Sequence, residues 1–547
     1  MPPASGSPGE ETAPWGGGAY RGGVDGEPPE PARLAELVAA LSLGIDLGFG
    51  QPMEHVLRQC LIALRLAERA GLDEQQRAVV YYTALLINVG CHTDAHEQAK
   101  WFGDDIAFKS RKYDGQPYGL RGAIRGIRLL GAGSPVLRRF RIGLEFAIAG
   151  HRDVDRMLQY HGRLARSLGE RLGLPYPVLD ALTCAYEQWD GRGWPGERAG
   201  DRVPVAARLA QIAEYVEVAH RLGGVTAARR TVRERAGRQF DPDLARLLYA
   251  DAPLLLADLG AVGTWEAVID AEPALAVVLT GDAIDTALRA VADFVDLKSP
   301  YFLGHGTAVA DLTSAAGVRV GLSRAEISQL RRVGLVHGLG RLGVSNAILD
   351  KPGPLGAGER ERARMQPYLT ERMLRQSPAL APLGRLAAMH RERLDGSGYP
   401  RGLTGTAIPL PARLLGAADV YRAMREPRSY RPALDPEEAR ARLRDEARAG
   451  RLDADAVAAV LGAAGHAVPR RLDGPGGLTR REVDVLRLLA RGLSNKDIAA
   501  RLVITSKTVG NHVEHIYAKI GASTRAAAGL YAVRHGLLPE DEPAKMG

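Results

Sequence analysis

Apolar residues recur at three- and four-residue intervals along most of the chain from Arg33 onward, and runs of β-branched residues are few. This spacing places apolar side chains on one face of an α-helix. The first 32 residues differ, because they are rich in glycine, proline and acidic residues and have too few apolar side chains to bury a core. The pattern predicts an all-α protein that follows a disordered leader over residues 1–32.

An internal repeat lies within the helical pattern. The segment "YEQWDGRGWPGERAGDRVPVAARLAQIAEYV" from Tyr186 corresponds to "RERLDGSGYPRGLTGTAIPLPARLLGAADVY" from Arg391. The identical residues keep a constant offset of 205 positions, so that Glu187, Asp190, Gly191, Gly193, Pro195, Pro204 and Arg208 match Glu392, Asp395, Gly396, Gly398, Pro400, Pro409 and Arg413. At an offset of 250, "LLINVGC" from Leu85 corresponds to "LVHGLGR" from Leu335. We therefore expect two copies of one helical domain, over residues 33–250 and 289–465, with connecting helices over residues 251–288.

The pattern changes again after a linker over residues 466–477. From residue 478 to residue 540 it predicts a compact unit of short helices with polar N-cap residues, for which the candidates are Thr479, Ser494 and Thr505. In the helix after Thr505 the apolar positions are spaced 4, 3 and 4 residues apart, at Val509, Val513, Ile516 and Ile520. One face of that helix should be buried, and the opposite face should be polar.

Charge supports a special role for this last unit. Between Leu478 and Leu538 there are ten Lys and Arg residues against four acids, which is most of the net charge of +8 of the whole chain. A solvated surface would also explain such an excess, and a polyanionic partner is favoured only if the cations lie on a docking surface.

Composition excludes several other classes of protein. No run of about 20 apolar residues is present, so no membrane-spanning helix is expected. Cys60, Cys91 and Cys184 lie far apart without a CxxC spacing, which supports neither a disulfide framework nor a thiolate zinc site. We expect a cytoplasmic protein without membrane contact.

The second copy resembles the HD-GYP family of HD-superfamily phosphohydrolases over about 175 residues, on His305, His337, "HRERLDGSGYPRGL" from His390, and Asp419. The resemblance implies a divalent metal site, usually iron or manganese, that hydrolyses cyclic di-GMP. It makes His305, His337, His390 and Asp419 the candidate metal ligands, because imidazole and carboxylate groups suit such ions. A carboxylate that bridges two ions lets both lower the pKa of a shared water.

Other positions of the second copy depart from that family. Gly338 stands where the bridging Asp belongs, Tyr368 falls where the family has a His, and Arg391 replaces the second His of a pair. Arg341 replaces a phosphate-binding Lys and could itself clamp a phosphate, since guanidinium groups pair with phosphate in a bidentate manner. We expect at most one divalent metal (Fe or Mn) here.

The first copy departs further. Ile87, Asn88 and Cys91 occupy the His-Asp and Lys positions, whereas Ala185 and Tyr186 occupy those of the His pair. By the same offsets, Glu214 corresponds to Asp419 and takes the late Asp position. His55 corresponds to His305 and remains without the other ligand residues. A structural role is favoured for this copy.

The last unit resembles the LuxR-type (GerE-like) helix-turn-helix domain across about 60 residues, including "LTRRE", "SNKDIA", "TVGNHV", "YAKIG" and "STRAAA". The resemblance implies four helices, with the third in the major groove of DNA and the last, from about Ser523 to His535, commonly forming a dimer contact. It makes Lys507, Thr508, His512 and Lys519 phosphate contacts and Asn511 the candidate base reader.

Three functional hypotheses follow from the sequence. The first is a DNA-binding transcriptional regulator, acting as a homodimer on double-stranded DNA at the nucleoid, whose HD-GYP-like region is sensory or dimerising with little or no catalytic activity. The second is a metal-dependent cyclic di-GMP phosphodiesterase with an accessory DNA-binding domain. In the third, a cyclic dinucleotide or another phosphate-bearing ligand docks at Arg341, Arg391 and the "DGSGYP" loop, and alters the dimer without being hydrolysed.

Overall fold

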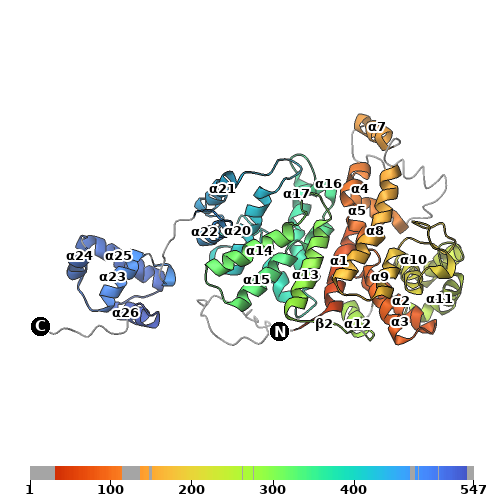
Figure 1. Ribbon diagram of the computed structural model, residues 1–547, viewed down its shortest axis with the longest axis horizontal. Coiled ribbons are helices and arrows are strands. Elements are labelled where there is room, and N and C mark those ends of the chain that lie inside the picture. The colour runs from red at the N-terminus through yellow and green to blue at the C-terminus, as the bar shows by residue number, and fades with distance from the viewer. Residues whose placement is uncertain are drawn as a thin grey trace, which may run out of the picture. The chain divides into compact units, whose positions relative to one another are not determined.

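The computed structural model describes residues 31–113, 136–146, 151–260, 263–274, 276–467, 475–478, 480–502 and 504–538. The chain divides into two compact units, of which the first ends at His466 and the second begins at Ala467 (Figure 1). In the described residues helices dominate, and the only paired strands are two of two residues each, β1 (Ala32–Arg33) and β2 (Val278–Leu279). The predicted all-α fold is confirmed.

The first half of the larger unit contains α1 (Leu34–Gly48) and the elements that follow it up to α12. These are α2 (His55–Arg69), α3 (Glu74–Leu86), η1 (Val89–His92), α4 (Ala95–Phe102), α5 (Asp105–Lys109), η2 (Ser110–Tyr113), α7 (Val136–Glu145), α8 (His151–Arg171), α9 (Tyr176–Thr183), η4 (Gly200–Arg202), α10 (Val205–Arg235), α11 (Pro242–Leu255) and α12 (Thr264–Asp270). Helix α10 is bent at Gly223 and Gly224, whose backbone angles are not helical, so it consists of two arms.

The second half begins at α13 (Gly281–Asp296), within the predicted connecting segment. Its other elements are α14 (His305–Arg319), α15 (Arg324–Val336), η5 (Leu339–Gly343), α16 (Asn346–Leu349), α17 (Ala357–Arg364), α18 (Gln366–Leu374), α19 (Ala381–Ala387), η6 (Gly405–Ala407), α20 (Leu410–Arg425), α21 (Pro436–Arg448) and α22 (Ala454–Ala463).

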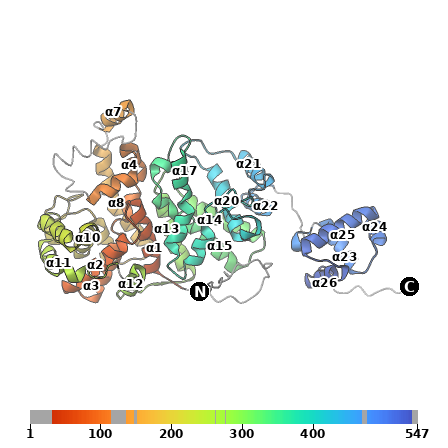
Figure 2. The same cartoon turned by 180° about the vertical axis from the view of Figure 1, so that it is seen from behind.

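The two halves share a core around α1. Both views show this helix in the middle of the larger unit, between α8 and α13 (Figures 1 and 2). Nearly every residue of α1 is buried, and it contacts α2 and α3 on one side and η5 and α18 on the other. A helix that is buried all round must be apolar on all faces, which the sequence "LAELVAALSLGIDLG" provides.

Polar contacts also connect the halves. The buried carboxylate of Asp105 accepts hydrogen bonds from the Ser345 hydroxyl at 2.7 Å and the Asn346 backbone N–H at 2.8 Å, and it pairs with the ammonium of Lys298 at 3.5 Å. Burial opposes ionisation of Asp105, but Lys298 and Lys109 outweigh it and lower the pKa to about 2. The halves therefore form one compact unit.

The two glycine-rich loops of the repeat have the same local structure. The peptide bonds before Pro195 and Pro400 are both cis, and Gly191 and Gly396 both have positive φ angles, of 74° and 80°. In each loop a buried glutamate accepts hydrogen bonds from the loop backbone, from Arg198 N–H to Glu187 and from Leu403 N–H to Glu392. The matching residues are therefore those that hold this loop conformation.

The smaller unit contains α23 (Arg480–Ala490), α24 (Asn495–Leu502), α25 (Ser506–Ile520) and α26 (Arg525–Arg534), after the short turn η7 (Pro475–Gly477). The predicted four helices are confirmed, and Thr505 is the N-cap of α25, accepting from the Thr508 backbone N–H. Ser494 and Asp497 bond reciprocally at the start of α24, with the Asp497 N–H donating to the Ser494 hydroxyl. Thr479 lies outside the described residues.

One boundary differs from the sequence prediction. Residues 1–30 lie outside the described residues, but Ala32 is not part of a disordered leader, because it is 1% exposed and pairs with Leu279 in the antiparallel strands β1 and β2. Burial against the helical core stabilises this short segment. Among the described residues, no helix is both long and apolar enough to cross a membrane.

Candidate functional site

His305, His337 and Asp419 meet inside the second half. His305 is the first residue of α14, after Gly304 in the left-handed conformation, His337 follows the last residue of α15, and Asp419 lies in the middle of α20. All three are buried, with at most 1% of each residue exposed. The Asp419 Oδ1 atom is 3.2 Å from His305 Nε2 and 3.7 Å from His337 Nε2. One ligand atom from each lies within 4.8 Å of the others, so the group could hold a metal ion.

His337 already has a cationic partner. Its Nδ1 is 2.5 Å from the Gly334 carbonyl oxygen, which acts as acceptor, and its Nε2 therefore accepts the hydrogen bond from Arg341 Nη2 at 3.3 Å. Burial lowers the pKa of His337, as does the positive charge of Arg341, in agreement with a neutral ring. The guanidinium of Arg341 thus engages the lone pair that a metal ion would need.

The glycine at position 338 makes room for this guanidinium. A Cβ atom at Gly338 would lie 2.9 Å from Arg341 Nη1 and 3.1 Å from Cζ. Arg341 also donates to the carboxylate of the buried Asp296 at 2.7 Å and packs its guanidinium over the ring of Phe302, 4.5 Å from the centroid. Arg341 is 2% exposed, so its guanidinium is engaged inside the protein rather than presented as a phosphate clamp.

A second guanidinium faces Asp419. The Arg391 Nη2 atom is 3.2 Å from Asp419 Oδ2. Burial opposes ionisation of Asp419, but the positive charge of Arg391 and the hydrogen bond from His305 outweigh it and hold the pKa of Asp419 well below its usual range. His390 packs edge-on against His337 with ring centroids 5.3 Å apart, but it is not part of the group of three ligand atoms. Its Nδ1 bonds the Ala387 carbonyl at 2.8 Å, and its buried Nε2 has no hydrogen-bond partner among the residues that the structure describes.

The fit of this site to metal ions is therefore partial. His305, His337 and Asp419 offer the two imidazoles and one carboxylate that suit iron or manganese. Glu426 lies 2.7 Å from His305 Nδ1, on the side of the ring away from Asp419, where a carboxylate can orient a metal-binding histidine. A second ion would lack the bridging carboxylate, because position 338 is a glycine, and it would lie near the positive charge of Arg391. Even a single ion would have to displace Arg341 from His337.

Sequence reasoning misplaced one position and missed three. Tyr368 is 39% exposed and its hydroxyl accepts from Arg372 at 3.1 Å, so it does not line the site. The buried polar residue at the start of α18 is Gln366, two positions earlier, whose amide nitrogen has no hydrogen-bond partner in the described part of the chain. Asp296, Glu426 and Phe302 were missed, because they lie outside the motif. A buried Asp nine residues before a helix start occurs in both halves, at Asp46 before α2 and at Asp296 before α14, and this repetition could have drawn attention to Asp296.

A related cluster is buried in the first half. Here the ammonium of Lys112, from η2, donates to Glu214 at 2.6 Å and to the Asn88 side-chain oxygen at 3.2 Å. Glu214 also accepts from the Tyr113 hydroxyl at 2.8 Å. Burial favours the neutral amine, but Glu214 outweighs it and raises the pKa of Lys112. Lys112 thus contacts residues at the two positions that correspond to Gly338 and Asp419.

Cys91 contacts a histidine of the same cluster. Its thiol lies 3.9 Å from His161 Nδ1, while His161 Nε2 bonds the Asp94 carboxylate. Burial opposes charge on the imidazole, but Cys91 and Asp94 outweigh it and raise the pKa of His161 to about 9. Asn88, Cys91 and Glu214 therefore lie in an ionic network, while His55 bonds Glu217 instead.

The second unit presents the predicted polar surface on α25. Lys507, Thr508 and Asn511 are exposed and His512 is half-buried, while Val509 and Ile516 are buried on the opposite side. Lys519 has a different role, because its ammonium donates to Glu482 at 2.7 Å and to the Gly477 carbonyl at 3.1 Å. It connects α25 to α23 and η7 and is less available to a phosphate than Lys507.

Comparisons with known proteins agree with this division. Residues 289–456 match the HD domain model, and residues 477–532 match the model of bacterial regulatory proteins of the luxR family. The 3'3'-cGAMP-specific phosphodiesterase 3 of Vibrio cholerae is 31% identical over 406 residues, which cover 73% of this chain and 88% of that protein. The cyclic di-GMP phosphodiesterase response regulator RpfG of Xanthomonas campestris is 34% identical over 154 residues, or 28% of this chain and 40% of that protein.

A solved structure extends the likeness to the fold. The crystal structure of a cyclic GMP-AMP specific phosphodiesterase of V. cholerae, V-cGAP3, has a TM-score of 0.55 and 26% sequence identity over 80% of this chain and 99% of its own. Fold and site together define an HD-domain protein with a LuxR-type DNA-binding domain. The chain belongs to the HD-GYP family, whose members include these phosphodiesterases.

Proposed function

We propose that the protein is a transcriptional regulator that binds double-stranded DNA through α25, and that its helical unit has a sensory or dimerising role with little or no hydrolase activity. The observation that carries this proposal is the hydrogen bond from Arg341 to His337 Nε2, at 3.3 Å, in the space beside Gly338. The exposed face of α25 supports the DNA-binding part.

DNA binding is tested by a mobility shift with promoter fragments obtained from genome-wide site mapping. We expect Lys507→Ala to weaken binding on all sequences and to reduce its salt dependence, and Asn511→Ala to reduce discrimination between sequences. The charge-matched control is Arg385→Ala, an exposed cation of the other unit. Unchanged binding by both α25 variants would refute the assignment of the recognition helix.

A homodimer is part of this proposal, and α26 supports it. Leu530 and Val533, on the outside of this helix, are 51% and 61% exposed. Exposed apolar side chains of this size on one helix face are typical of a contact surface. Sedimentation of the full chain should show a dimer that Leu530→Glu weakens, and a monomeric wild-type protein would contradict this part of the proposal.

We further propose that the first half is a diverged copy of the second. The equal loops at Pro195 and Pro400 support this, as do the 15-residue helices that begin at His55 and His305. The relationship to the V. cholerae phosphodiesterase also extends beyond residues 289–456, since it spans 406 residues.

The alternative function is a metal-dependent phosphodiesterase that acts on a cyclic dinucleotide. It is favoured by the close approach of His305, His337 and Asp419 and by the phosphodiesterase activities of the relatives. In that case these three residues would hold one divalent ion (Fe or Mn), which would activate a water for attack on phosphate. Metal analysis with hydrolysis assays on cyclic di-GMP and 3'3'-cGAMP decides between the two, because turnover with a bound metal would refute the inactive site.

Ligand binding without hydrolysis is a variant of the proposal that the protein is a transcriptional regulator. A cyclic dinucleotide or another phosphate-bearing ligand could dock beside Arg391 and the "DGSGYP" loop without hydrolysis, although Arg341 is paired internally. We propose that the protein acts in the cytoplasm, and at the nucleoid when bound to DNA.

A further inference from the structure

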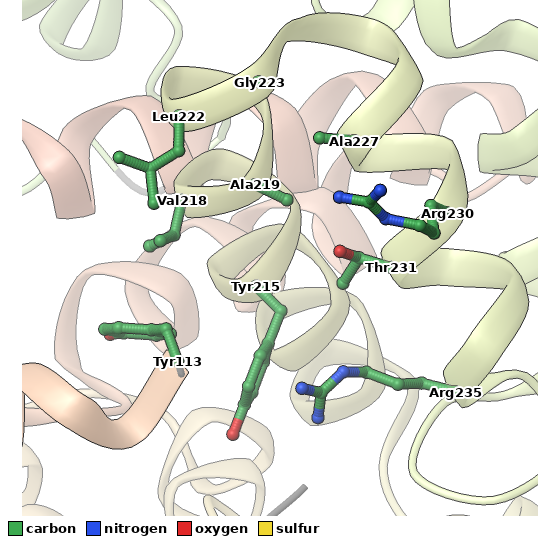
Figure 3. A pocket seen from close by; sticks show the side chains of 10 residues that line it. All are labelled: Tyr113, Tyr215, Val218, Ala219, Leu222, Gly223, Ala227, Arg230, Thr231 and Arg235. Carbon is green, nitrogen blue, oxygen red and sulfur yellow. The ribbon is translucent and has the colours of Figure 1, made fainter. Parts of the chain in front are cut away.

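A cavity of about 250 Å³ lies between the two arms of α10 in the first half. One arm contributes Tyr215 and Leu222, and the other, beyond the bend at Gly223 and Gly224, contributes Arg230, Thr231 and Arg235. Figure 3 shows the guanidinium groups of Arg230 and Arg235 extending from their arm toward the arm that carries Tyr215. The cavity is slightly smaller than the roughly 300–1,000 Å³ that is usual for ligand pockets.

The lining of this cavity is positively charged. No carboxylate lines it, and neither Arg230 nor Arg235 forms an ion pair with an acid among the residues that the structure describes. The Arg235 guanidinium instead has uncharged partners, the side-chain oxygen of Gln239 at 2.5 Å and the ring of Tyr215, 4.6 Å from its centroid. Two cations without counter-ions in one concave site favour an anionic ligand.

The shape of the lining indicates which anion. Arg230 and Arg235 lie five positions apart on one arm and approach the cavity from two levels (Figure 3), which favours a group that offers oxygens in more than one direction. A carboxylate has two oxygens, which a single guanidinium can satisfy in a bidentate manner. A phosphate monoester has three terminal oxygens, which two guanidinium groups can share. Apart from Thr231, the other walls are aromatic or apolar, from residues such as Tyr113, Tyr215 and Leu222, and they suit a flat organic body.

The second half has an insertion at the corresponding place. Its chain between Pro409 and Gly450 is eight residues longer than the chain between Pro204 and Gly237. The extra residues follow α20 and turn inward, where Glu426 contacts His305 at 2.7 Å and Arg428 lies over Phe302, 4.7 Å from the centroid. The first half has only the glycine bend there, which leaves the cavity between the arms of α10.

We propose that this cavity binds a nucleoside monophosphate or a similar phosphate ester, with the phosphate at Arg230 and Arg235 and the ring system against the apolar walls. Tyr113 connects the cavity to the buried cluster, because its hydroxyl donates to Glu214 at 2.8 Å. A ligand against Tyr113 would therefore contact the network around Lys112. The role of this ligand as the signal of the regulator rests on the proposed function, but its binding to the cavity does not.

The test is calorimetric titration of the full chain, without DNA, with AMP, GMP, adenosine, inorganic phosphate and benzoate. We expect AMP or GMP to bind at least tenfold more tightly than adenosine, phosphate or benzoate. Arg230→Ala should weaken that binding at least tenfold, while Arg233→Ala, an exposed cation of the same arm that does not line the cavity, should leave it within twofold. Ala227→Leu, which fills the cavity, should also abolish binding while helix content by circular dichroism stays unchanged.

Several results would overturn the inference. They are no binding of AMP or GMP at millimolar concentration, equal binding of benzoate, or binding that Arg230→Ala and Ala227→Leu leave intact. A mobility shift with and without the nucleotide separates the two proposals. Binding of AMP without any change in DNA affinity would leave the site standing and refute only its role as the signal of the regulator.

Discussion

The larger unit buries two ionic clusters, and they differ in the source of their positive charge. In the second half, guanidinium groups of Arg341 and Arg391 lie against His337 and Asp419. In the first half a single ammonium, that of Lys112, lies between Asn88 and Glu214. Arg341 belongs to the motif itself, whereas Lys112 comes from η2, a different part of the chain.

The difference shows that a buried carboxylate can keep its charge through any nearby cation. Asp419 and Glu214 both have lowered pKa values although burial favours their neutral forms, because Arg391 in one case and Lys112 in the other outweighs burial. Where a metal ion supplies positive charge in a metalloenzyme, side chains supply it here. Each cluster can thus persist as structure without metal chemistry.

The largest expected effect is that of Lys112→Met. The change leaves Glu214 buried without its cation, which should lower the free energy of unfolding by about 3–5 kcal/mol at pH 7. Urea unfolding followed by tryptophan fluorescence reports on this half, since Trp101, Trp189, Trp194 and Trp265 all lie in it. Adding Glu214→Gln should restore much of the loss.

Arg246→Ala is the matched control, because this cation forms an exposed pair with Asp243 and should change stability very little. An equally small effect of Lys112→Met would contradict the view that its ammonium holds the first cluster together.

Arg341→Met should destabilise the second half by somewhat less, about 2–3 kcal/mol. Asp296 loses its partner, but burial has already raised its pKa, so the carboxyl can take up a proton more readily than Glu214. Urea unfolding followed by circular dichroism measures the change, and Asp296→Asn in the same chain should recover part of it. If the double variant were no more stable than Arg341→Met, the ion pair would not be the source of the effect.

The arrangement of elements could be predicted from the sequence because it follows from local patterns. The helix spacing, the caps at Ser494 and Thr505, and the matching loops at Pro195 and Pro400 are each encoded within a few residues. The partial metal ligand group of His305, His337 and Asp419 was also accessible, since each residue lies in a recognisable motif.

The cations could not be predicted in the same way. Gly338 looked like a simple loss of a ligand, and only the structure shows that its missing side chain gives space to Arg341. Lys112 has no counterpart in the motif, because it reaches Glu214 from 102 positions earlier in the chain. Tyr368 was misplaced by two positions relative to Gln366, which on a helix exchanges an exposed residue for a buried one.

Restoring the missing carboxylate at position 338 tests whether Arg341 competes with a metal ion for His337. Gly338→Asp combined with Arg341→Lys adds a carboxylate and removes the guanidinium from His337 Nε2. We expect this double variant to bind Mn²⁺ at least tenfold more tightly than the wild-type chain in calorimetric titration, with a corresponding rise in metal content. Gly338→Asn with Arg341→Lys controls for size without charge, and equal affinities in all three chains would show that Arg341 does not compete with a metal.

The smallest effect concerns two carboxyl groups at matching places, Asp46 and Asp296. Each accepts a hydrogen bond from a backbone N–H ten residues later, from Val56 at 3.0 Å and from Gly306 at 2.7 Å. Within the described ranges, only Asp296 is hydrogen-bonded to an arginine. Burial raises the pKa of Asp46 to about 7, from an unfolded value near 4. Because the folded state binds this proton more tightly, the contribution of Asp46 to stability is greatest below about pH 4 and declines as the pH rises toward 7.

Asp46→Asn removes that decline, because an amide cannot ionise and its oxygen can still accept from Val56. Relative to the wild-type chain, this variant should therefore gain about 2 kcal/mol of stability between pH 5 and pH 6.5. Asp296→Asn should instead lose stability throughout this range, since it deprives Arg341 of its anionic partner. Urea midpoints of the wild-type chain and the two variants at several pH values measure both trends. If the two variants had parallel pH profiles, the pairing with Arg341 would not distinguish Asp296 from Asp46.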